Sequence, residues 1–186
     1  MNLELRKAGR EFALADDADF ADRKSARKVN WQLVEPQRHR GAEKDFRVMR
    51  EWLTIERIYE GFPLFFRRVT NLDIQSLRPL LPNLAVVTHQ FAKRKPNGLP
   101  EPTYNDGLAE MDHELITAFD VDRMGVPVLI ETFGGERNYY FYIAADADAP
   151  SVISAIAWRY PDERLSWTIR PDPEWSSIER YAREHF

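Results

Sequence analysis

The sequence predicts an α+β domain built on one antiparallel sheet, and three observations predict it. Apolar residues alternate with a period of two in several short stretches, which is typical of strands. A stretch near the middle of the chain changes to the helical period, and glycine or proline residues separate the stretches. From Leu84 to Arg170 the resulting order is strand, helix, strand, strand, helix, strand. This order predicts a ferredoxin-like βαββαβ sandwich, extended by an N-terminal β-hairpin and a C-terminal helix.

Length and composition favour a single core with an appendage. The chain has 186 residues, of which 44% are hydrophobic. Residues 51–186 hold 19 of the 23 aromatic side chains, so the core is expected there. We therefore predict a charged, helical N-terminal extension at 1–50, with one or two surface helices, and a single α+β domain at 51–186.

The first elements of the domain are predicted in chain order. Residues 52–59 and 64–69 are rich in strand-forming residues and flank a Gly-Phe-Pro turn, which predicts a hairpin that extends the sheet. Asn71 is expected to cap a short helix that ends before Pro79. Leu84 to Phe91 is an expected buried strand. The next residues, 93–104, contain three prolines and a glycine and are predicted to form an exposed loop without a helix.

A helix is predicted from Asn105 onward because five apolar residues share one helical face. These residues are Leu108, Met111, Leu115, Ile116 and Phe119. Three acidic residues of the same stretch are expected to point mostly elsewhere: Glu110, Asp112 and Glu114.

The C-terminal half of the domain contains a second hairpin. Val126 to Phe133 and Arg137 to Ala145 are predicted strands, joined by Gly134-Gly135, which supplies the positive φ angles of a tight turn. A helix from Val152 to Trp158 and a strand from Arg164 to Arg170 complete the order. The last helix is expected to open at Pro173, with Asp172 as its cap and with one shared apolar face. That face consists of Trp175, Ile178, Tyr181 and Ala182.

Several classes of site lack support in the sequence. The chain has no cysteine, so disulfides, thiol nucleophiles and thiolate metal sites are excluded. No two of the four histidines have the spacing of four residues by which one helix face holds zinc. The serines have no Gly-x-Ser-x-Gly context. We therefore predict no metal, no cofactor and no catalytic residues, and an apolar run of about 18 residues for a membrane span is also missing.

Charge indicates the kind of partner. Residues 51–186 carry 21 acidic and 14 basic side chains, and an acidic body makes nucleic acid an unfavourable partner. The charge favours another protein, with a basic one preferred, and the oligomeric state stays open. The N-terminal residues contain no long apolar run of a secretory signal, so a cytoplasmic location is expected.

The run from Arg137 to Tyr142 is the sharpest local feature, because it places aromatic rings on both faces of one strand. In RNA-recognition modules of the same element order, exposed aromatic residues of this strand stack on bases, and Tyr139 with Phe141 fits that pattern. The strand from Leu84, however, lacks the matching aromatic residue. The favoured alternative is that one aromatic row packs beneath the helices and that the N-terminal extension covers the other.

Several short motifs resemble the bacterial domain-of-unknown-function family 695. They are Trp52, Gly61-Phe62-Pro63, Arg68-Val69-Thr70-Asn71, Gly134-Gly135-x-Arg137-x-x-Tyr140-Phe141-Tyr142 and Asp172-Pro173-Glu174-Trp175. The later motifs are also similar to the B-type regulator of ribonuclease E activity. That second resemblance implies an acidic protein that binds and inhibits a nuclease without performing chemistry.

These observations lead to three functional hypotheses. The first is a non-enzymatic, protein-binding domain that regulates a partner such as a nuclease. Its candidate binding positions, expected at the surface, are Arg137, Tyr139, Tyr142, Glu174 and Trp175. The second is a single-stranded RNA-binding module that uses the aromatic rings of the strand from Arg137 to Ala145. The third is an enzyme that uses carboxylates and tyrosines in a cleft near the proline-rich loop.

Overall fold

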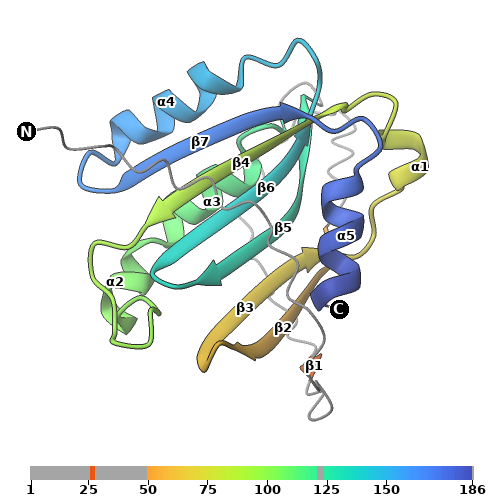
Figure 1. Cartoon of the computed structure of the whole chain (residues 1–186). Helices are drawn as coiled ribbons and strands as arrows, with labels where there is room; N and C mark the ends of the chain where they lie inside the picture. Colours follow the sequence, from red (N-terminus) through yellow and green to blue (C-terminus); the bar gives the residue numbers. More distant parts are fainter. Residues whose placement is uncertain (1–25, 28–49, 121–123, 186) are drawn as a thin grey trace, which may run out of the picture.

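The computed structural model of the chain describes residues 26–27, 50–120 and 124–185. The strands are β1 (Ala26–Arg27), β2 (Trp52–Tyr59), β3 (Phe62–Val69), β4 (Asn83–Gln90), β5 (Gly125–Phe133), β6 (Glu136–Ile143) and β7 (Arg164–Pro171). The helices are α1 (Ile74–Leu77), α2 (Pro102–Gly107), α3 (Ala109–Thr117), α4 (Ala149–Arg159) and α5 (Ser176–His185). The strands form one antiparallel sheet in the order β1-β2-β3-β5-β6-β4-β7 (Figure 1). The fold is therefore of the predicted α+β class.

Two tight hairpins and two helical connections produce this strand order. Glu60 and Gly61 have φ angles of 50° and 80° in the β2–β3 turn, and Gly134 and Gly135 have φ angles of 62° and 95° in the β5–β6 turn. Consecutive positive φ angles suit two-residue hairpin turns. The predicted N-terminal hairpin extends the sheet because β3 pairs with β5. The connection through α2 and α3 passes over β6, and the connection through α4 passes over β4.

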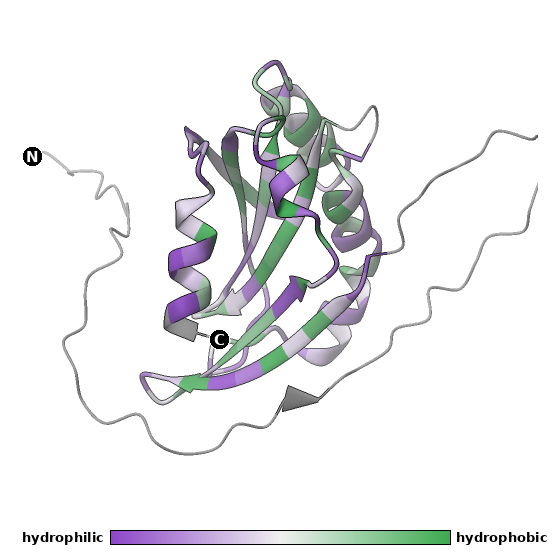
Figure 2. Ribbon diagram, turned by 90° about the vertical axis from the view of Figure 1, so that its right-hand side faces the viewer, coloured by the Kyte–Doolittle hydropathy of each residue, from purple (hydrophilic) through white to green (hydrophobic). Residues whose placement is uncertain are grey.

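One face of the sheet is buried against α3 and α4. Its largest contributions from β6 are Tyr139 and Phe141, which are fully buried. The helices and the residues directly beside them contribute the apolar side chains Leu108, Met111, Leu115, Phe119, Ala149, Ile153 and Ile156. Four of the five residues that the helical period assigned to one face, all but the half-buried Ile116, are thus in the core. The alternation of hydrophobic and hydrophilic residues along the strands is visible in Figure 2.

The other face of the sheet is covered by the C-terminal part of the chain. α5 lies in front of the sheet and α3 behind it in Figure 1. The ring of Tyr142 stacks on that of Trp175, with a centroid distance of 3.9 Å and an interplanar angle of 5°. Phe66, Leu84 and Tyr181 complete the centre of this second core. The second aromatic row of β6 is therefore covered by α5 and the segment before it. Apart from residues 26–27 and 50, the N-terminal extension that was expected to cover this row lies outside the described residues.

Two local expectations in the first half of the domain are wrong. The cap of α1 is Asp73, whose side chain accepts from Ser76 N, because the Asn71 side chain instead accepts from Glu51 N at 3.0 Å. The predicted loop at 93–104 includes the start of α2, with a proline in its first turn. A proline at that position needs no hydrogen-bond partner for its nitrogen and has a φ angle suited to a helix.

The last helix starts later than predicted. Pro173 belongs to a turn and α5 begins at Ser176, yet the Asp172 carboxylate does accept from Ser176 N at 2.9 Å and Ser177 N at 3.0 Å. The helices expected at 1–50 lie outside the described residues, except that 26–27 form a strand. No helix in the described part of the chain is both long and apolar enough to cross a membrane.

Candidate functional site

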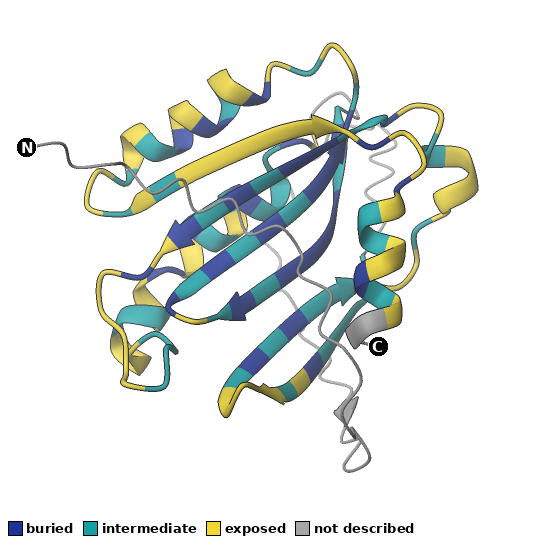
Figure 3. Cartoon of the chain, viewed as in Figure 1, coloured by how far each residue is buried: buried dark blue, intermediate teal, exposed yellow. Residues whose placement is uncertain are grey.

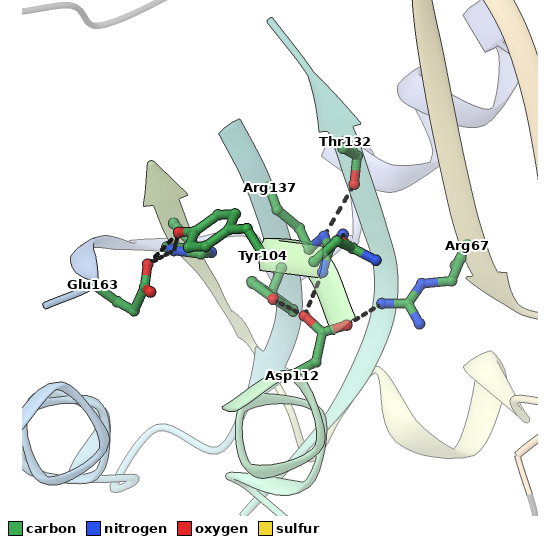
Figure 4. A network of polar contacts seen from close by, with 9 residues as sticks. Arg67, Tyr104, Asp112, Thr132, Arg137 and Glu163 are labelled. Carbon is green, nitrogen blue, oxygen red and sulfur yellow. Dashed lines mark hydrogen bonds and ion pairs between the residues drawn. The ribbon is translucent and has the colours of Figure 1, made fainter. Parts of the chain in front are cut away.

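Polar side chains gather beneath α2 and α3, at the end of the sheet where β4 ends and β6 begins. Nine residues form what we call the polar network, and Figure 4 labels six of them. They are Arg67, His89, Tyr104, Asn105, Asp112, Thr132, Arg137, Tyr139 and Glu163. Because His89 lies opposite Arg137 in the register of β4 and β6, the network has two adjacent halves.

Asp112 is the centre of the first half. Its carboxylate accepts from Arg137 Nη1 at 2.7 Å and from Arg67 Nη2 at 2.9 Å. The hydroxyl of Tyr139 donates to the same oxygen as Arg137 does. Two cations and a phenol thus converge on one carboxylate of α3, and this arrangement ties the helix to β3 and β6.

Each nitrogen of the Arg137 guanidinium donates a hydrogen bond to a neighbouring side chain. Its Nε donates to Thr132 Oγ1 at 3.1 Å and its Nη2 donates to Asn105 Oδ1 at 2.8 Å. Its central carbon lies 5.5 Å from the centroid of the Phe91 ring. All three guanidinium nitrogens of a buried side chain therefore have acceptors, which satisfies the requirement for burying such a cation.

These contacts determine the protonation states of Asp112 and Tyr139. Burial is the largest influence on Asp112 and opposes its ionisation, but Arg137, Arg67 and the Tyr139 hydroxyl together hold the pKa of its carboxyl below its usual range. Burial and the neighbouring carboxylate raise the pKa of Tyr139 well above its usual range. The network thus contains an ionised carboxylate and a neutral phenol at neutral pH.

The second half of the network centres on Glu163, which follows α4. Its carboxylate lies 2.7 Å from His89 Nε2 and also accepts from the hydroxyl of Tyr104. That hydroxyl in turn accepts from Ala92 N at 3.1 Å. Burial, together with Glu163, raises the pKa of Tyr104 to about 12. The fully buried His89 has no partner for Nδ1, so its neutral ring carries its hydrogen on Nε2, toward Glu163.

A pH dependence of stability follows from His89. Burial lowers the pKa of this ring more than Glu163 raises it, so the folded protein binds a proton less readily than the unfolded chain. The free energy of unfolding should therefore fall as the pH drops through about 6.5, by at most about 1.4 kcal/mol per pH unit.

Urea unfolding of full-length protein between pH 7.5 and 5 measures this slope. His89→Gln should reduce the slope, whereas His113→Gln, at an exposed position of α3, should leave it unchanged. An equal slope in the wild type and in the His89 variant would show that burial of His89 does not govern this pH range.

The structure places four of the five predicted binding residues in the interior. Arg137, Tyr139, Tyr142 and Trp175 are buried, and only Glu174 is exposed. The expectation that all five lie at the surface is corrected accordingly, because Arg137 and Tyr139 belong to the polar network and Tyr142 stacks on Trp175. The structure brings each of these two pairs together, on opposite faces of the sheet.

Burial also determines whether the aromatic rings of β6 can stack on nucleic-acid bases. The rings of Tyr139 and Phe141 are fully buried against α3 and α4. A base can stack only on a ring face that solvent reaches. These two side chains are therefore unavailable as stacking platforms in this conformation, and the reason is that both odd-numbered aromatic residues of β6 face the helices.

An exposed strand was not among the predicted sites. β7 is the last strand of the sheet, and all its residues except the half-buried Leu165 are exposed, as the yellow strand beside α4 shows in Figure 3. Its side chains include Trp167, 36% exposed, and Ile169, 38% exposed. The alternation of Leu165, Trp167 and Ile169 predicted the strand, but only the strand order shows that it forms an edge.

A second exposed feature lies at the opposite half of the sheet. The β2–β3 turn, the β5–β6 turn and the loop after β4 gather at one end of the sheet, at the left of Figure 1. Between them lies an open basin of about 560 Å³, lined among others by Phe62, Phe133, Arg94 and Lys95. In the described residues, no three His, Asp or Glu side chains are grouped so that they could hold a metal ion.

Comparison with known proteins gives one match, to the sequence model of a protein family. The sequence model described as "Family of unknown function (DUF695)" matches residues 51–181. No curated protein and no solved structure matches the chain, so the resemblance to the nuclease regulator stays a prediction.

Proposed function

The chain belongs to the DUF695 family of unknown function, and from this premise we propose that its domain binds another protein by adding an extended segment of that protein to β7. The observation that carries the proposal is the exposed edge of β7, eight residues long. An edge strand offers a row of backbone donors and acceptors to an incoming strand.

The hydrogen-bond pattern between β4 and β7 shows which backbone groups of β7 are available to an added strand. Asp172 N donates to Pro82 O at 2.8 Å, in continuation of the register that pairs Arg170 with Leu84. In antiparallel pairs, hydrogen-bonded positions alternate along the strand. The N–H and C=O groups of Leu165, Trp167 and Ile169 therefore point away from β4, toward the position of an added strand.

The side chains of β7 define the chemistry of a suitable segment. Trp167 and Ile169 lie opposite Val87 and Ala85, on the sheet face that α4 covers, and they favour apolar residues beside them. Arg164 and Arg170 lie on the other face and favour carboxylates. A second copy of β7 paired around Trp167 would instead place Arg164 opposite Arg170, and like charges destabilise such a pair.

The local charge of β7 differs from that of the domain as a whole. The excess of acidic residues favours a basic partner at long range, whereas the contact strand itself presents arginines. We therefore define the partner by an extended segment with alternating apolar and acidic residues and not by its net charge. A nuclease as partner and a cytoplasmic location remain predictions within this proposal.

A photo-crosslinking experiment tests the proposal. A benzophenone amino acid replaces Trp167 in the full-length chain in the cells that produce it, and irradiation should give a discrete protein adduct. Adding Ile169→Pro should remove the adduct, because proline lacks the outward N–H while the bonds to β4 stay in place.

Two controls make the outcome decisive. The same benzophenone at Trp158, an 83% exposed residue of α4, should not give the adduct. Circular dichroism should show that the Ile169→Pro chain is folded. An adduct that persists in the folded proline variant, or a failure to form any adduct from position 167, would contradict binding along β7.

A further inference from the structure

The basin between the hairpin turns combines apolar rings with a run of cations. Lys93, Arg94 and Lys95 are consecutive and exposed, and the last two line the basin beside Phe62 and Phe133. Phe62 is 44% exposed. This positive loop stands on a domain that is acidic as a whole, so it is the part of the domain to which an acidic segment would be drawn.

The loop that carries the cations is fixed to the sheet. Lys95 N donates to Leu99 O at 2.8 Å and Phe91 N donates to Gly135 O at 3.0 Å. A Cβ at Gly98 would lie 3.1 Å from the Cα of Gly134, which shows how closely the loop approaches the β5–β6 turn. The basin is therefore formed before any ligand arrives, and this lowers the entropy cost of binding.

The register of β1 directs the preceding chain toward this basin. β1 runs antiparallel to β2, with Ala26 opposite Ile55 and Arg27 opposite Thr54. The residue of β2 next to Ile55 in this direction is Glu56, so β1 is oriented with its N-terminal end toward Glu60, which lines the basin. Glu60 lies five residues beyond Ile55, about 17 Å along a strand.

The sequence just before β1 is complementary to the basin. Residues 11–22 hold five acidic and no basic side chains, together with Phe12, Leu14 and Phe20. Phe20 precedes Ala26 by six residues, which can span about 20 Å, so the segment can reach the basin. We propose that residues 11–22 dock in this basin of their own chain, with carboxylates near Arg94 and Lys95 and with aromatic side chains near Phe62 and Phe133. The contact does not depend on the proposed role of β7, which lies at the other edge of the sheet.

The lack of native cysteines permits a direct test in the full-length protein. One cysteine replaces Ala18 in the acidic segment and a second replaces Pro96, which lines the basin. At micromolar protein and low salt, mild oxidation should give an intramolecular disulfide. The matched control pairs Ala18→Cys with Ser151→Cys, an exposed position of α4. The rate of disulfide formation should be about tenfold higher for the basin pair, beyond the effect of the tether that both pairs share.

Charge reversal tests the recognition itself. Arg94→Glu with Lys95→Glu should lower the rate of the basin pair to that of the control pair, and adding Asp16→Lys with Asp17→Lys should restore it. High salt should also slow the basin pair, because it screens exposed charges. Equal rates for the two pairs at low salt would overturn the proposal. Disulfides that form mainly between chains, at a rate that rises with concentration, would also overturn it and would indicate a second copy as the occupant.

Discussion

Replacing Asp112 by alanine should lower the free energy of unfolding by about 3–5 kcal/mol, the range observed when one partner of a buried ion pair is removed. Asp112 is the common acceptor of Arg137, Arg67 and Tyr139. Without it the buried guanidinium of Arg137 keeps its charge and loses a principal acceptor. Urea unfolding at neutral pH measures the loss.

The same helix provides a matched control for Asp112. Glu114 accepts from Arg159 Nε at 3.0 Å in an exposed pair, and such pairs contribute about 0–1 kcal/mol. Glu114→Ala should therefore cost much less than Asp112→Ala. If Asp112→Ala does not fold, the double variant Asp112→Leu with Arg137→Met removes both charges and should recover part of the stability. Equal, small losses for both single variants would contradict the central role of Asp112.

The contribution of the Asp112 carboxylate to stability should be lost at low pH. The pKa of Asp112 is lowered in the fold, so the unfolded chain takes up this proton first as the pH falls. The stability from Asp112 is present above its unfolded pKa of about 3.9 and is lost as the pH falls through the lower pKa of the folded state. This range lies below that of His89, so the two effects can be separated in a pH series.

The sequence predicted those elements whose signals are local. The hairpin turn at Gly134 and Gly135 depends on positive φ angles that glycine adopts without strain, and the β6 strand follows from alternation. The prolines of 93–104 predict a loop, because proline is typical of loops, but proline also suits the first turn of a helix, where Pro102 lies. Asn71 does not cap α1, because its side chain bonds to a residue 20 positions earlier, and no local pattern contains that contact.

The polar network was harder to predict, although one signal was present. Asp112 lies four residues after Leu108 and three before Leu115, so helical spacing puts it on the buried face of α3. The prediction that Asp112 points away from this face is therefore wrong, because its carboxylate lies against Arg137 and Arg67. A carboxylate on a buried face needs a cation, but which cation depends on the strand order, because Arg67 and Arg137 are 45 and 25 positions away in the sequence.

The aromatic strand shows a second limit of the sequence. Alternation along β6 places its aromatic residues on two faces, but it does not say which face is open. Both are covered, by α3 and α4 on one side and by Trp175 with α5 on the other. The exposed features to which we assign binding as proposals are instead an edge strand and a basin between turns. Both depend on the neighbours of each element.

Trp175→Ala should cost about as much stability as Asp112→Ala, for a different reason. The indole is 1% exposed, stacks on Tyr142 and donates from Nε1 to Leu81 O at 2.9 Å. Truncation of a buried tryptophan to alanine leaves a cavity and costs about 3–5 kcal/mol. It also leaves a buried carbonyl without its donor, which adds to the penalty.

Burial of the Trp175 side chain explains why this residue has an unfavourable backbone conformation. Its φ angle is 55°, in a region that costs a residue with a Cβ about 1 kcal/mol or more, and the burial of the indole offsets this cost. Trp175→Gly should therefore be slightly less destabilising than Trp175→Ala, because glycine adopts this φ angle freely. Trp158→Ala, which removes an 83% exposed indole from α4, should change the free energy of unfolding by less than about 0.5 kcal/mol. Urea unfolding of the three variants distinguishes these values, and a loss for Trp175→Ala no larger than that for Trp158→Ala would mean that the Trp175 side chain does not hold α5 against the sheet.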